Sequence, residues 1–313
     1  MSTGTLGQSA FAGIEPHLIR LMTSQSDRLH PALFSLFVDS DGQNGQSGTI
    51  AFQVTMAKWV KVADFSAAVR LNSLLIHYWR LPRPEVLISI TGGAADFVLP
   101  PRLLHAFSQG LAVAALSAKA WIFTGGSDTG VMKLVGETVR RHDIRTPVIG
   151  VFPWGALNNR GILEDACGGT AIYKASPHTK EGAPLNPFHS NFLLVDNGTT
   201  GHDAWGAEIE LRNSLEAYVS RSWHVPMVQL VVHGGFGTLA TILTAAMDAT
   251  PIVILADSGG AATAIYSYFQ SGLEGVEQKF QAHEGTLKQV SGAEAPAWQW
   301  AFSQQHGCGR VVV

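Results

Sequence analysis

The stretch Val86-Leu-Ile-Ser-Ile-Thr-Gly-Gly93 sets the pattern of this chain, because a short apolar run ends in a glycine turn and a helix-like stretch follows. Trp121-Ile-Phe-Thr-Gly-Gly126 repeats the pattern ahead of a second helix-like stretch, residues 130–141. The first helix is expected to begin at Pro100 or Pro101, where a helix does not need the missing proline N–H. The sequence therefore predicts strands that alternate with helices.

Four further apolar runs are expected to be strands, at residues 148–152, 192–195, 227–232 and 252–255. The last of them follows a helix expected over residues 237–247. Strands that are apolar along their whole length are typical of a parallel sheet covered on both faces. The sequence predicts an α/β fold, a doubly wound (Rossmann-like), mostly parallel sheet with helices on both faces. Ligands of such sheets bind at the carboxyl ends of the strands.

Three units are expected along the chain. Residues 1–57 form a peripheral segment with a mobile loop at 39–48, where turn-forming residues dominate. Residues 58–270 form the ligand-binding domain, and residues 271–313 form a C-terminal helix and tail. Residues 154–190 are rich in Gly, Pro and Asn and much longer than an ordinary connection of about four to six residues, which indicates a functional or partly mobile loop.

Charged residues make up 14% of the chain, the formal net charge is −3, and no run of five or more Lys or Arg occurs. This composition argues against nucleic acid or an anionic membrane as a partner. No apolar run approaches the roughly 18 residues that span a bilayer, and the start lacks a secretory signal, so we expect a cytoplasmic protein without membrane insertion. Cys167 and Cys308 are too few for a disulfide framework or a zinc site, and no metal site is predicted.

Three pairs of adjacent glycines end predicted strands: Gly92-Gly93, Gly125-Gly126 and Gly234-Gly235. Glycine lets a ligand approach the backbone, and the N–H groups of the following helix present partial positive charge to a phosphate. One such pair is as often a plain tight turn, but three at one sheet edge favour a phosphate cradle. The predicted contacts are Thr91, Gly92, Gly93, Thr124, Gly125, Gly126, Ser127, Asp196, Gly234, Gly235, Phe236, Gly237 and Thr238.

Familiar catalytic and cofactor motifs are incomplete. Residues 235–240 fit the G-x-G-x-x-[GA] dinucleotide pattern, with Asp257 placed to meet a ribose, but they come after most of the sheet. Val131 and Met132 stand where a P-loop needs Lys and Ser or Thr. Ser127 does not fit the G-x-S-x-G pattern and no H-E-x-x-H pair occurs, so no catalytic residue is assigned.

The helix expected from about Gly206 carries a second set of candidate contacts. Trp205 and Arg212 are seven residues apart, two helical turns, so they project on one side. There an indole can stack on a base and a guanidinium can grip a phosphate. Equally, Glu208, Arg212 and Glu216 have the i, i+4, i+8 spacing of an exposed ion ladder. The spacing alone leaves both interpretations open.

Four segments match one family in the same order: Leu87-Ile-Ser-Ile-Thr-Gly-Gly-Ala94, Ala120-Trp-Ile-Phe-Thr-Gly-Gly-Ser-Asp-Thr-Gly-Val-Met-Lys133, Asn191-Phe-Leu-Leu-Val-Asp-Asn-Gly198 and Gly234-Gly-Phe-Gly-Thr-Leu239. Over roughly residues 59–269 the chain resembles the SLOG (LSDAT) domain of the cytosolic N-terminus of melastatin-type TRP channels. The resemblance implies a Rossmann-like sheet. It also implies a nucleotide-sensing role, with ADP-ribose or a related nucleotide as ligand and no further cofactor.

The resemblance implies particular contacts as well. In the channels that bind ADP-ribose through this domain, a tyrosine and an arginine seven residues apart contact the ligand, and Trp205 and Arg212 stand at the matching positions. A second ligand-contacting arginine aligns near Gly260, so one contact is absent from this sequence. The departure weakens the case for ADP-ribose in particular more than the case for a nucleotide.

Two alternatives remain beside a nucleotide-sensing domain. The chain more distantly resembles LOG-type phosphoribohydrolases, which are lysine-decarboxylase-like Rossmann proteins with the motif P-G-G-x-G-T-x-E-E. Ala240 and Thr241 replace both glutamates, which argues against an enzyme unless another carboxylate acts: Asp128, Asp196 or Glu208. The second alternative is an assembly module with a vestigial pocket that forms homo-oligomers.

Overall fold

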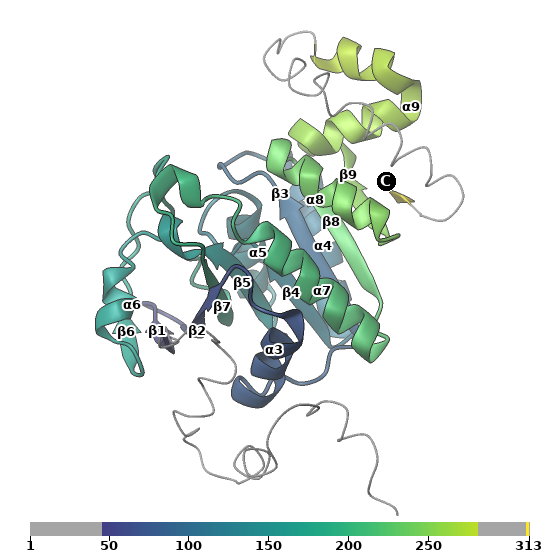
Figure 1. Cartoon of the computed structure of the whole chain (residues 1–313). Helices are drawn as coiled ribbons and strands as arrows, with labels where there is room; N and C mark the ends of the chain where they lie inside the picture. Colours follow the sequence, from purple (N-terminus) through teal and green to yellow (C-terminus); the bar gives the residue numbers. More distant parts are fainter. Residues whose placement is uncertain (1–45, 281–310, 313) are drawn as a thin grey trace, which may run out of the picture.

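A computed structural model describes residues 46–280 and 311–312, in which ten strands form one sheet in the order β10-β9-β8-β3-β4-β5-β7-β2-β1-β6 (Figure 1). Neighbouring strands pair in parallel, except that β1 and β2 are antiparallel. The doubly wound, mostly parallel sheet predicted from the sequence is confirmed. Its strands are β1 Ser47–Ala51, β2 Met56–Ala63, β3 Val86–Gly92, β4 Ala120–Thr124, β5 Val148–Pro153, β6 Thr170–Ile172, β7 Asn191–Asp196, β8 Met227–Val232, β9 Ile252–Leu255 and β10 Val311–Val312.

The central strands are the ones that the apolar runs predicted. β8 and β9 have the predicted bounds, and β3, β4, β5 and β7 run one or two residues further than expected. Every residue of β4 and β5 is buried, because helices cover both faces of the sheet there.

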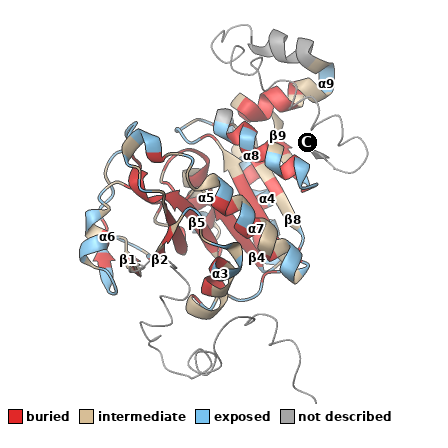
Figure 2. Cartoon of the chain, in the orientation of Figure 1, coloured by how far each residue is buried: buried red, intermediate tan, exposed pale blue. Residues whose placement is uncertain are grey.

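The helices form two layers around the sheet (Figure 2). Ile88 and Ile90 of β3 face a core cluster built with α4 and α5, whereas Leu87 faces a cluster built with α3 and α7. This division follows from the strand period, which points alternate side chains to opposite faces. The helical elements are α3 Ala68–Ser73, η2 Leu74–Tyr78, α4 Pro101–Ser117, α5 Gly130–Arg141, η3 Trp154–Ala156, α6 Gly161–Asp165, η4 Gly201–Ala204, α7 Ile209–Trp223, α8 Phe236–Met247, η5 Ala256–Ser258 and α9 Gly260–Phe280.

The sheet begins earlier in the chain than expected. β1 pairs with β2 on one side and with β6 on the other, so residues 47–51 are strand, although the sequence predicted a peripheral segment up to residue 57. Ile50 of this strand is fully buried against Trp59 and Phe192 in a third core cluster. Residues 39–45 of the expected mobile loop lie outside the described residues.

The segment 154–190 is more ordered than the sequence suggested. It contains η3, α6 and β6, and Leu163, Tyr173 and Leu185 bury their side chains in the same cluster as Trp59. Its scattered apolar residues have a core to join, so part of the expected loop is secondary structure packed on the sheet.

α9 runs from Gly260 to Phe280, but the backbone at Ser271 and Gly272 is non-helical and divides it into two helical pieces. The expected boundary at residue 270 lies directly before this break. β10 adds to β9 at the edge of the sheet. The rest of the predicted C-terminal tail, residues 281–310 and 313, lies outside the described residues.

The chain reverses its direction of travel across the sheet at β3. From β3 it builds outward through β4 and β5 to β7, then returns through α7 to place β8 on the other side of β3. The turns after β3 and β8 therefore lead in different directions and leave a crevice between them. In open α/β sheets this is where ligands bind.

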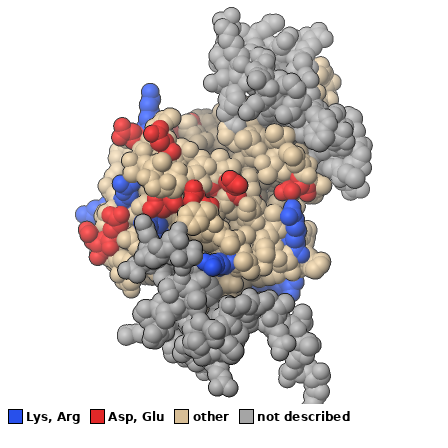
Figure 3. All heavy atoms as spheres, in the orientation of Figure 1, with Lys and Arg blue, Asp and Glu red and all other residues tan. Residues whose placement is uncertain are grey.

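On the face seen in Figure 3, Lys and Arg side chains stand apart from one another and form no basic patch. In the described ranges, no helix is long and apolar enough to cross a membrane, and no group of three or more His, Cys, Asp or Glu could hold a metal ion.

Candidate functional site

A cavity of about 510 Å³ lies at the carboxyl ends of β3, β4 and β8, at the crevice that the topology creates. We call it the cleft. It brings together residues from the three predicted glycine turns and from the start of α7. The predicted residues that line it are Thr91, Gly92, Gly93, Gly125, Ser127, Trp205, Arg212, Gly234, Gly235, Gly237 and Thr238.

The turn between β8 and α8 presents open amides to the cleft. Gly234 has a φ of +102°, a conformation that favours glycine. The N–H of Gly235 donates weakly to Oγ1 of Thr238 at 3.3 Å, and that hydroxyl donates to the carbonyl of Gly92 at 3.0 Å. Within the part of the chain that the structure describes, the N–H groups of Gly237 and Thr238 meet no acceptor. The first turn of α8 is therefore free to receive an anion.

The turn between β4 and α5 has the same glycine pair, but the amides of Gly126, Asp128 and Gly130 are already bonded. The Gly126 N–H donates to Oγ1 of Thr124 at 2.9 Å, and the Asp128 N–H donates to the carbonyl of Pro184 at 2.8 Å. At the start of α5, the Gly130 N–H donates to Oδ1 of Asp96 at 2.8 Å. These amides have no capacity left for a ligand phosphate.

Two predicted contacts in this second turn lie beneath the cleft and not on its surface. Thr124 is fully buried and bonds Nε2 of His189 at 2.6 Å. Burial lowers the pKa of His189 to about 3, so the ring is neutral. Because Oδ1 of Asn186 can only accept, His189 carries its proton on Nδ1 and donates to that oxygen at 3.1 Å, so its Nε2 accepts from the Thr124 hydroxyl. Thr124 and Gly126 thus belong to a buried structural network.

Arg212 reaches the cleft from α7, but most of its guanidinium is committed to the protein. Nε donates to Glu216 at 2.8 Å, and both side chains are buried. Nη2 lies within hydrogen-bond distance of Ser89 Oγ and of the carbonyls of Ile90 and Phe123. The exposed ion ladder considered above is therefore excluded.

One part of Arg212 stays available. Nη1 meets no acceptor among the described residues, while Arg212 lines the cleft. Of the guanidinium group that was predicted to grip a phosphate, only Nη1 is thus available to a ligand. An anchored guanidinium loses little conformational entropy when it binds, because its other donors already fix its position.

Trp205 and Glu208 line the cleft beside Arg212. Trp205 packs edge-on against Phe152, with ring centroids 5.7 Å apart. Burial raises the pKa of Glu208 to about 6, although its carboxylate accepts the N–H of Gly206 at 3.1 Å. The cleft therefore contains one acidic group that titrates close to neutral pH.

Two predicted contacts are not placed at the cleft. Asp196, at the end of β7, forms an ion pair with Lys61 at 3.2 Å and does not line the cavity. Phe236 begins α8, but its side chain lies outside the described residues.

The sequence did not predict a contact that the loop between β3 and α4 makes with the turn after β8. Phe97 of this loop stacks on His233, with ring centroids 4.6 Å apart and planes inclined by 15°. His233 has a φ of +58°, unusual for a residue with a side chain, and burial lowers its pKa. Asp96, the residue before Phe97, also lines the cleft. The only signal in the sequence was the position of these residues directly after Gly92-Gly93.

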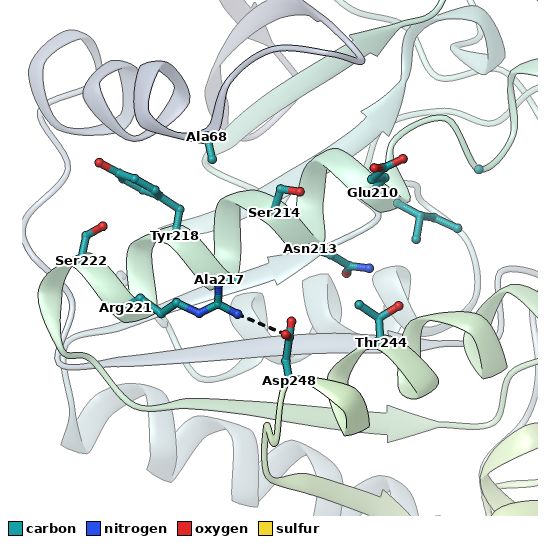
Figure 4. A pocket seen from close by; sticks show the side chains of 12 residues that line it. Ala68, Glu210, Asn213, Ser214, Ala217, Tyr218, Arg221, Ser222, Thr244 and Asp248 are labelled. Carbon is teal, nitrogen blue, oxygen red and sulfur yellow. Dashed lines mark hydrogen bonds and ion pairs between the residues drawn. The ribbon is translucent and has the colours of Figure 1, made fainter. Parts of the chain in front are cut away.

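A second cavity adjoins the cleft along α7, between Ala68 and α8 (Figure 4). Its floor is made of helix side chains, and Arg221 there forms an ion pair with Asp248 at 3.1 Å. None of the open amides of α8 line it. The cleft is therefore the better candidate for an anionic ligand.

Comparison with known proteins places the chain in a family. The family model for the SLOG domain of TRPM channels matches residues 57–291. A TRPM member-like 2 channel from Nematostella vectensis is 35% identical over 255 residues, 75% of this chain and 16% of the relative. TRPM2 of Rattus norvegicus is 37% identical over 67% of the chain, and TRPM7 of Homo sapiens 33% over 74%. The chain spans 13–16% of the length of these channels. It belongs to the family of SLOG domains found in TRPM channels.

Proposed function

We propose that this chain is a cytosolic ligand-sensing domain that binds a nucleotide, ADP-ribose or a relative, in the cleft. The observation that carries the proposal is the first turn of α8, where the N–H groups of Gly237 and Thr238 have no acceptor in the described chain and line a cavity of about 510 Å³. A helix N-terminus with free amides stabilises a phosphate through hydrogen bonds and the helix dipole.

The remaining walls suit the other parts of a nucleotide. Trp205 is only half-buried, so its ring can contact a base or a ribose while it packs edge-on against Phe152. The free Nη1 of Arg212 adds positive charge near the phosphate position. Apolar walls with a few fixed polar groups are typical of small-molecule sites.

Isothermal titration calorimetry of the full chain with AMP, ADP-ribose, NAD and cyclic ADP-ribose tests the proposal. We expect saturable binding of at least one of them. Gly237→Pro removes one amide in a helix turn that tolerates proline, and it should weaken that ligand by about 1.5–3 kcal/mol. Gly237→Ala retains the amide and is the matched control. No saturable heat at millimolar ligand, with folded protein, would refute the proposal.

One observation supports a second candidate function, hydrolysis of a nucleotide N-glycosidic bond. Glu208 lines the cleft with a pKa raised to about 6, which suits a group that transfers a proton near neutral pH. The test is chromatography of free base released from AMP or NAD. Activity lost in Glu208→Gln would support an enzyme, and no release after long incubation would leave binding as the function.

A further inference from the structure

The loop between β3 and α4 places a carboxylate where the fold offers a second anion position. Asp96 Oδ1 accepts the N–H of Gly130, the first residue of α5, at 2.8 Å. Its Oδ2 lies 3.4 Å from Nζ of Lys133, one turn further along that helix. The carboxylate thus occupies the place that a phosphate takes at a helix N-terminus.

Asp96 is held in this position and stays charged. The Gly130 N–H, more than any other group, lowers the pKa of Asp96, and Lys133 lowers it further. The stack of Phe97 on His233 fixes the next residue of the loop. The N–H of Val131 donates to Gly93 at 2.8 Å and ties the start of the loop to α5.

The two helix starts beside the cleft therefore differ. At α8 the N–H groups of Gly237 and Thr238 meet no acceptor in the described chain, whereas at α5 the Gly130 N–H is bonded to Asp96, and Gly130 itself does not line the cavity. Asp96, Gly237 and Thr238 all line the same cavity. A ligand that puts one phosphoryl group at α8 fits this arrangement, whereas a second phosphoryl group directed toward α5 meets a fixed negative charge.

Resting on the proposed function, we propose that Asp96 is a specificity-determining residue. Because its carboxylate occupies the start of α5, the cleft selects nucleotides with one phosphoryl group over those with a diphosphate. The hydroxyl groups of a ribose can donate to the carboxylate, as ribose hydroxyls do to acidic residues in other doubly wound sheets. A diphosphate ligand binds only after Asp96 leaves Gly130.

AMP and ADP-ribose separate this effect from general repulsion, because each carries about two negative charges at pH 8. Calorimetry on the full chain should show AMP binding at least about tenfold more tightly than ADP-ribose. Asp96→Ala should reduce that preference by about tenfold, through tighter binding of ADP-ribose. Asp96→Asn keeps an acceptor for Gly130 without the charge, and it should shift the preference in the same direction even if the alanine variant folds poorly.

Glu85→Gln is the matched control, because Glu85 carries an exposed carboxylate paired with Lys119 just before β3, at the opposite end of the strand from the cleft. It should leave the ratio of the two affinities unchanged. A wild-type preference for ADP-ribose, or a ratio that the Asp96 variants leave unchanged while AMP binds, would overturn this inference alone. Absence of binding by either nucleotide to every variant would overturn both this inference and the proposed function.

Discussion

The turns after β4 and β8 have the same local sequence pattern and differ in which amides are bonded. Each follows an apolar strand, contains two adjacent glycines and leads into a 12-residue helix. At the β4–α5 turn, the amides of Gly126, Asp128 and Gly130 are bonded within the protein, whereas at the β8–α8 turn those of Gly237 and Thr238 have no acceptor in the described chain. Adjacent glycines thus mark where a phosphate could approach, and tertiary contacts decide whether the amides remain available.

The largest expected effect concerns the buried ion pair between Arg212 and Glu216. Arg212 donates to the carbonyls of Ile90 in β3 and Phe123 in β4, and Glu216 balances its charge. Glu216→Ala leaves a buried guanidinium unpaired and should lower the free energy of unfolding by about 3–5 kcal/mol. Urea denaturation measures it. Glu210→Ala, on the exposed side of α7, is the control and should cost under about 1 kcal/mol; equal losses would contradict a buried pair.

A glycine from each turn tests the comparison directly. Gly126 has a φ of +76°, and an added Cβ would lie 2.9 Å from Cα of Gly150, so Gly126→Ala should cost about 3 kcal/mol of stability. An added Cβ at Gly235 meets no atom within 4 Å, and Gly235→Ala should change stability by under about 0.5 kcal/mol. Thermal unfolding of the two variants measures both. Similar losses in the two would show that the β8–α8 turn is as tightly packed as the other.

Glu208, the acidic group of the cleft with the raised pKa, should make the free energy of unfolding depend on pH. Because the folded-state pKa of Glu208 is raised to about 6, the protonated form is favoured by folding. Its stabilising contribution is complete below the unfolded pKa of about 4.3 and is lost as the pH rises through 6. Glu208→Gln should therefore be about 1–2 kcal/mol more stable than wild type at pH 7.5 and match it at pH 4. Taking the difference between the two proteins cancels other titrations, including that of His233. A difference that does not change with pH would contradict the raised pKa.

The smallest expected effect concerns the contact between Phe97, in the loop after β3, and His233, in the turn after β8. Phe97→Ala removes the stack on His233 and should lower the free energy of unfolding by about 1 kcal/mol. Phe97→Leu keeps most of the apolar contact and is the control. Denaturant titration of both variants measures the aromatic contribution. No loss in Phe97→Ala would mean that Asp96 alone holds the loop.

Burial explains which parts of the fold were predictable. β8, β9 and α5 were predicted to the residue because buried parallel strands are continuous apolar runs and helices between them start at glycine or proline. β1 and the three-residue β6 are short and pair with each other across more than a hundred residues of sequence, so local patterns carried no signal. The helix expected from Gly206 starts at Ile209, because residues 201–204 form a separate 3₁₀ turn.

Of the candidate site, only the glycine turns of the backbone could be predicted from the sequence. Glycine turns can be read from the sequence, but the i, i+4 spacing of Arg212 and Glu216 is the same for an exposed pair and a buried one. Ser89, a polar residue in an otherwise apolar strand, was the available sign that a charged group lies against β3. Asp96 carried no sign of its role, because only the folded chain brings its loop onto α5.

β3 pairs with two strands, β4 and β8, that are synthesised at different times, and this has a consequence for folding on the ribosome. β4 emerges soon after β3, but β8 follows more than a hundred residues later, on the order of ten seconds at typical translation rates. Throughout that interval one edge of β3 has no partner strand, and half of the cleft does not yet exist. A small molecule that binds there cannot guide the nascent chain through its early steps; it can only trap the completed sheet.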